Sequence, residues 1–250
     1  MKARPAWLTH TLRGLVLLVL CTLALQLVFV ARIALMNVID PQSTTFQRSE
    51  AWRLLTQKGQ VAWSQTWVDA DRISPNLKRA VIASEDAGFN EHGGIDWDAV
   101  EKAWDRNQRA EDRVEKLKQR QPTRAVVAKV VGGSTISQQL AKNLFLSGER
   151  TVLRKAQEML LTLTLETLLS KQRLLEIYLN NVEWGEGLFG AQAAARHYFR
   201  TDAARLSVAQ AARLAVMLPA PKRFEKNPGS AYVLGRSATI AARMGDVQLP

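Results

Sequence analysis

The stretch LVLLVLCTLALQLVFVA, from Leu15 to Ala31, contains no charged residue. It constrains the fold more than any other feature of the chain, because about 17 to 25 apolar residues are enough for a helix to cross the hydrocarbon core of a membrane. The apolar character resumes after Arg32 and continues to Val38. The sequence therefore predicts one transmembrane helix over residues 15–38.

The charges before this helix predict its orientation. Lys2, Arg4 and Arg13 precede the apolar run, and positive flanking residues favour the cytoplasmic side. We therefore expect residues 1–14 to be cytoplasmic and residues 39–250 to form an extracytoplasmic domain. A cleaved signal peptide is the alternative, but the run is longer than a typical signal core and no small-x-small cleavage site closes it.

Composition narrows the class of protein and its partners. The 34 Lys and Arg against 23 Asp and Glu residues give a formal net charge of +11, which predicts attraction to nucleic acid, anionic lipid or phosphorylated substrates. Membrane tethering disfavours the nucleic-acid reading. The single cysteine, Cys21, excludes an internal disulfide framework.

After the anchor, the patterning is mainly helical. Apolar residues recur at helical spacing over 48–58 and 74–84, where Leu77, Val81 and Ile82 form one stripe. No alternating pattern is long enough to support a large sheet. The charge-dense run over 106–124 is typical of either a solvated helix or a mobile loop, and we favour a mobile segment.

The first candidate site is EDAGFNEHGGID, residues 85–96. It combines the adjacent carboxylates of Glu85 and Asp86 with Phe89, His92 and a glycine pair. Glycines weaken regular elements and charges resist burial, so this composition indicates either a functional turn or a solvated loop between two helices.

The second is GGSTISQQLAKNLFL, residues 132–146. Thr135, followed three residues later by Gln138, predicts a capping box at a helix start. Helical spacing then separates an apolar face (Ile136, Leu140, Leu144) from a polar face (Thr135, Gln139, Lys142). A helix N-terminus with a lysine nearby is a natural anion site; the alternative is an ordinary amphipathic helix.

The third is ERTVLRKAQEMLLTLTLE, residues 149–166. Glu158 follows Arg154 by four residues, so both share a helix face. Together with Arg150 and Lys155 they form either a structural ion-pair cluster or a carboxylate held ionised by cations that suit a diphosphate.

A fourth stretch, residues 171–199, is interpreted as architecture: an amphipathic helix, a glycine-rich connection and a helix of small residues. The histidines His10, His92 and His197 show no metal-ligand spacing.

In this order the four stretches resemble the glycosyltransferase family that polymerises peptidoglycan from a lipid-linked disaccharide, a family of bifunctional penicillin-binding proteins and monofunctional enzymes. The resemblance covers residues 70–230. Because the sequence ends at Pro250 without transpeptidase motifs, it is similar to the monofunctional form. Ser137 stands where the family usually has Thr, a change that we expect to be tolerated.

The resemblance implies a mainly α, lysozyme-like domain with a small membrane-proximal lobe, in the bacterial inner membrane. It implies that lipid II and a growing glycan chain are the substrates, with undecaprenyl diphosphate released on inversion. Glu85 is then the general base and Glu158 the second essential carboxylate. The implied substrate-binding residues are Asp86, Phe89, His92, Thr135, Gln139, Lys142, Arg150, Arg154 and Lys155.

Cofactors and partners are less constrained. No cofactor is required by the sequence; diphosphate chemistry leaves Mg²⁺ or Mn²⁺ open, and the metal site is unknown. The expected partners are membrane lipids and cell-division or elongation synthesis proteins. The alternatives are a lysozyme-like glycan-cleaving enzyme, for which cations around Glu158 have no evident use, and a non-catalytic lipid II-binding scaffold.

Overall fold

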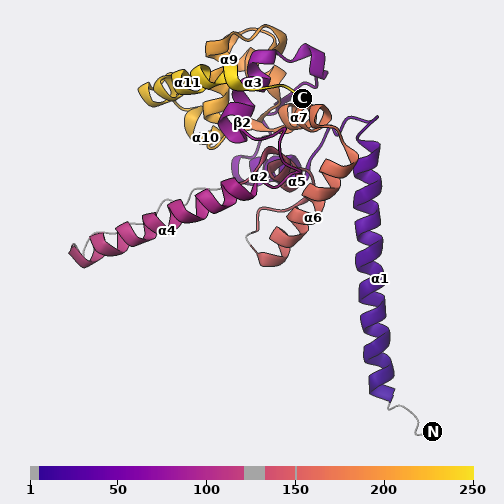
Figure 1. Cartoon of the computed structure of the whole chain (residues 1–250). Coiled ribbons are helices and arrows are strands. Elements are labelled where there is room, and N and C mark those ends of the chain that lie inside the picture. Colours follow the sequence, from indigo (N-terminus) through magenta and orange to yellow (C-terminus); the bar gives the residue numbers. More distant parts are fainter. Residues whose placement is uncertain (1–5, 121–132, 150) are drawn as a thin grey trace.

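The computed structural model describes residues 6–120, 133–149 and 151–250. Figure 1 shows a body of packed helices from which α1 and α4 project in different directions, with the N-terminus at the far end of α1. The helices are α1 (Ala6–Leu35), α2 (Thr45–Lys58), α3 (Pro75–Glu85), α4 (Trp97–Arg120), α5 (Ile136–Phe145), α6 (Val152–Leu168), α7 (Lys171–Asn181), α8 (Ala191–Phe199), α9 (Val208–Met217), α10 (Pro221–Phe224) and α11 (Ala231–Arg243). The predicted mainly helical fold is confirmed.

Sheet structure in the described residues is limited to three short strands. These are β1 (Ser64–Gln65), β2 (Glu183–Gly185) and β3 (Leu188–Phe189), in the order β1-β3-β2. Single turns of 3-10 helix lie at Ala70–Arg72, Ala203–Arg205 and Met244–Asp246. The predicted similarity of this helical domain to lysozyme stays a prediction.

Helix starts follow the local sequence signals. Thr135 caps α5 and forms the predicted capping box with Gln138, because each side chain satisfies a backbone N–H that the first turn leaves free. Ser74 caps α3, with Pro75 at its first position. The helix predicted over 48–58 begins three residues earlier, at Thr45, with a second capping box from Thr44.

The core lies where α3, α9 and α11 pack together and where α5 packs against α6. The predicted stripe of Leu77, Val81 and Ile82 is buried there. Trp184 is fully buried, and its indole N–H donates to the carbonyl of Leu214 at 3.1 Å. This packing fixes α3, whose last residue is Glu85.

The charged run is helical rather than a mobile loop as far as the structure describes it. Residues 106–120 continue α4, which projects from the body in Figure 1. The interpretation as a mobile segment is therefore wrong for these residues, because closely spaced charges of both signs are compatible with a solvated helix. Residues 121–124 lie outside the described residues.

The anchor helix is docked on the body. Residues 10–35 are long and apolar enough to span a membrane, while residues 36–38, predicted as the end of the span, form a turn. Near the C-terminal end of α1, Ile33 and Met36 belong to the buried core. Deeper in the span, the amides of Gln26 and Gln157 pair reciprocally at 2.9 and 3.2 Å. The C-terminal part of α1 thus packs beside α6.

This docking predicts a specific crosslink in membranes. In a Cys21→Ser background, Gln26→Cys with Gln157→Cys is expected to react efficiently with a short bifunctional thiol reagent, because the two side chains meet. Leu25→Cys with Gln157→Cys is the matched control, since Leu25 is 51% exposed and lies about 100° around the helix from Gln26. Equal crosslinking of both pairs would show that α1 rotates freely against α6.

Candidate active site

The predicted turn over 85–96 begins at the last residue of α3 and joins α3 to α4. Asp86 is buried and holds this turn against α5. One carboxylate oxygen accepts the backbone N–H of Ile136 at 2.9 Å, at the N-terminus of α5, and the other lies 2.8 Å from Nε2 of His92. A carboxylate suits this position because the free N–H groups of a helix start carry partial positive charge.

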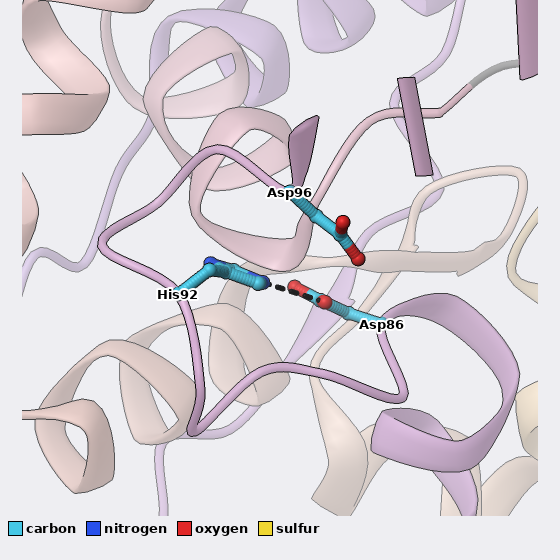
Figure 2. A group of neighbouring side chains, drawn as sticks. All are labelled: Asp86, His92 and Asp96. Carbon is cyan, nitrogen blue, oxygen red and sulfur yellow. Dashed lines mark hydrogen bonds and ion pairs between the residues drawn. The ribbon is translucent and has the colours of Figure 1, made fainter. Parts of the chain in front are cut away.

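Asp96 joins Asp86 and His92 in one cluster, drawn in Figure 2, whose potential ligand atoms lie within 4.8 Å of one another. The sequence missed this cluster, because spacings of six and four residues in a loop have no fixed geometry.

The hydrogen bonds of the cluster, however, are those of a structural turn. Nδ1 of His92 accepts the N–H of Gly94 at 3.1 Å, so the imidazole proton of the neutral ring is on Nε2 and points at Asp86. Asp96 accepts the N–H of Ala99 at 2.8 Å at the start of α4. Nε2 of His92 could ligate a divalent cation only if its proton moved to Nδ1, which would break the hydrogen bond from Gly94 that shapes the turn.

Phe89, a residue of the same turn, is fully buried. The ammonium of Lys171 lies 4.5 Å from its ring centre and donates to the carbonyl of His92 at 2.7 Å and to Glu166 at 2.9 Å. Ser137 also donates to Glu166, at 2.5 Å. Sequence reasoning missed Lys171 and Glu166, which carry no local signal for this role.

Ser137 offers a direct test of this network. Ser137→Ala is expected to lower the free energy of unfolding by about 1–3 kcal/mol, because Glu166 loses a buried donor. Ser137→Thr keeps the hydroxyl and is expected to cost less, despite its extra methyl group. Urea unfolding of both variants measures the difference, and equal losses would assign the effect to packing instead.

Glu85 lies at a pocket of about 240 Å³ formed by the turn, α4 and the start of α5. Burial raises the pKa of Glu85, hydrogen bonds from Gln139 and Ser84 oppose this, and the charge of Asp86 raises it further. The amide of Gln139 donates to its carboxylate at 3.1 Å. Thr135 lines the same pocket, although its hydroxyl is used to cap α5 and to donate to the carbonyl of Gly94 at 2.7 Å.

Glu158 lies in a second pocket, of about 420 Å³, formed by α2, α5 and α6. Its buried carboxylate accepts from Arg154 at 2.7 Å and also pairs with Lys155, as the helical spacing predicts. Burial lowers the pKa of Lys142, which lines this pocket too. Arg150 lies outside the described residues.

The two pockets adjoin. Ser134 lines both, and Gln139 reaches from the second pocket to the carboxylate of Glu85. The structure thus brings residues of the three predicted stretches to these two adjoining pockets, called the groove below, with Glu85 at one pocket and Glu158 among its cations at the other. Phe46 and Ser49 of α2 complete the second pocket; sequence reasoning missed them because nothing local links α2 to α6.

A helical body with a candidate membrane span, a buried carboxylate in one pocket and a cluster of cations in the adjoining pocket has the features expected of an enzyme that acts on an anionic substrate. A model of the family described as Transglycosylase matches residues 53–245. The chain is 50% identical over 228 residues to a biosynthetic peptidoglycan transglycosylase of Paraburkholderia xenovorans (strain LB400), covering 91% of this chain and 88% of the relative. It is 52% identical to the protein of the same name from Burkholderia thailandensis, over 91% of this chain and 83% of that relative. The chain therefore belongs to the transglycosylase family.

Proposed function

We propose that this protein is a peptidoglycan glycosyltransferase that polymerises lipid II into glycan strands. The observation that supports this most is the shared groove, in which Glu85, with its raised pKa, adjoins the cations around Glu158. Family membership and the names of the relatives support a peptidoglycan precursor as the substrate.

The proposed step is an inverting displacement. The 4-hydroxyl of lipid II attacks the anomeric carbon of the growing chain, so that a carbon–oxygen bond forms as the bond to undecaprenyl diphosphate breaks. Glu85 takes the hydroxyl proton, for which a pKa nearer neutrality is an advantage. The negative charge that develops on the departing diphosphate is stabilised by Lys142, Arg154 and Lys155.

Glu158 has a separate role in this scheme. Its carboxylate holds Arg154 and Lys155 at the pocket wall, so that their charges are aimed before the substrate arrives. A preorganised charge stabilises a transition state without the cost of reorganising it. Arg150, which belongs to the same stretch, is proposed to add to this cluster.

The proposed location is the bacterial inner membrane, with α1 crossing it once and the groove on the extracytoplasmic side. The basic N-terminal flank, and one candidate span in the part of the chain that the structure describes, support this orientation. Anionic headgroups would attract the basic body. Cell-division or elongation synthesis proteins stay proposed partners. The transfer as proposed requires no metal ion, and Mg²⁺ or Mn²⁺ would add positive charge at the diphosphate.

The test is incubation of the purified full-length chain with labelled lipid II, followed by separation of products by size. Polymer that a muramidase can digest supports the proposal. Shortening of added glycan strands would favour a cleaving enzyme, and retention of lipid II without product would favour a scaffold.

A further inference from the structure

Tyr178 of α7 lies behind the groove at the end of a chain of side-chain hydrogen bonds. Its hydroxyl donates to Oε1 of Gln139 at 3.0 Å, and Nε2 of Gln139 donates to Oε2 of Glu85 at 3.1 Å. Tyr178 is 1% exposed, so no substrate can reach it. These two hydrogen bonds therefore connect Tyr178, a core residue, to the carboxylate of Glu85 only through the side-chain amide of Gln139.

An amide can present either its oxygen or its nitrogen to a neighbour, and the surrounding hydrogen bonds select between these orientations. With N–H toward Glu85, Gln139 stabilises the ionised carboxylate. With the orientation reversed, its oxygen would face Glu85 and accept from the protonated acid instead. In that state the hydroxyl hydrogen of Tyr178 would lose its acceptor, which costs free energy in a buried site.

We propose that Tyr178 is a positioning residue for Glu85, because its hydroxyl holds the Gln139 amide in the orientation that keeps the carboxylate ionised and able to accept a proton. The expected effect on catalytic turnover rests on the proposed function. The hydrogen-bond chain itself does not depend on which substrate occupies the groove.

Other charged groups around Glu85 come from several elements. Asp86 and Asp96 lie on the turn, Arg106 on α4 lines the same pocket, and Lys142 on α5 lines the adjoining one. Substituting Tyr178 alters none of these charges. A change in the pKa of Glu85 in such a variant is therefore attributable to the hydrogen bonds that run from Tyr178 through Gln139.

The first experiment is the pH dependence of lipid II polymerisation by wild type, Tyr178→Phe and Tyr198→Phe. The acid limb is the low-pH side of the activity profile, where activity falls. In Tyr178→Phe we expect it to move to higher pH by about 0.5–1 unit, which corresponds to the free energy of one hydrogen bond. Tyr198→Phe is the matched control, since its hydroxyl donates to the backbone carbonyl of Trp184 at 2.8 Å, away from Glu85. Its acid limb should coincide with that of wild type.

The second experiment needs no turnover. Infrared spectra of the full-length chain are recorded against pH, and the carboxylic acid band that Glu85→Gln removes is assigned to Glu85. Its midpoint is expected to rise in Tyr178→Phe and to stay at the wild-type value in Tyr198→Phe. Thermal unfolding of each variant shows that the fold persists.

The outcomes separate the two proposals. Unchanged midpoints and acid limbs in folded Tyr178→Phe would overturn the positioning role while leaving a polymerising enzyme intact. An equal shift in Tyr198→Phe would overturn it too, because the effect would then be general. If wild type makes no polymer but the infrared midpoint shifts, the positioning of Glu85 stands and the proposed function fails.

Discussion

Glu85→Gln is expected to reduce glycan polymerisation by about 10²–10⁴-fold, the range that a positioned general base contributes. Glutamine has nearly the same shape but cannot accept the hydroxyl proton. Because the amide of Gln139 already donates to this position at 3.1 Å, the variant can keep a hydrogen bond by presenting its own oxygen. The fold should therefore survive while product formation from labelled lipid II is lost.

The control for this variant is Glu91→Gln, which removes an exposed carboxylate from the same turn. It should polymerise at the wild-type rate. Substantial activity in Glu85→Gln, with Glu91→Gln equally active, would mean that another group takes the proton.

We expect the ionisation of Glu85 to set the pH dependence of polymerisation by the wild-type protein as well. A general base works only when ionised, so activity falls as pH drops through its pKa. Burial raises that pKa above the ordinary value of 4.5, so we expect the acid limb to lie above the range of a solvated glutamate. In Glu85→Gln this limb should be absent from any residual activity.

Glu158→Gln is expected to lower activity by about 10²-fold or more, the cost of losing one preorganised charge contact. Arg154 and Lys155 would lose the carboxylate that aims them, at 2.7 Å in the case of Arg154. We also expect the free energy of unfolding to fall by about 1.5–3 kcal/mol, the range for hydrogen bonds to charged groups. The loss is smaller than for a fully buried pair because the Lys155 side chain is 49% exposed.

Glu176→Gln separates these two effects. Glu176 pairs with Arg173 at 2.8 Å and accepts the N–H of Ala70 at 2.9 Å, outside the groove. Its replacement should lower stability by a similar amount and leave polymerisation intact. If both variants lose activity in proportion to stability, Glu158 is a structural residue only.

Much of the local structure could be predicted because it depends on neighbours in the chain. Thr135 and Gln138 satisfy each other's backbone groups within one turn, so their spacing alone identifies the start of α5. The same holds for the pair of Arg154 and Glu158 on one helix face. Over residues 106–120 the expected loop was wrong, because charge density does not distinguish a solvated helix from a loop.

The sequence by itself determined an apolar helix of spanning length, the helical class of the body and the stretches that carry the candidate site. Only the tertiary structure decided that Glu85 and Glu158 open onto adjoining pockets, that Lys171 and Glu166 support the turn, and that Tyr178 reaches Glu85 through Gln139. The physical reason is the distance along the sequence over which each interaction acts. Capping and helical periodicity act within about four residues, whereas the contacts of Tyr178 with Gln139, of Gln139 with Glu85 and of Lys171 with His92 join residues 39, 54 and 79 positions apart.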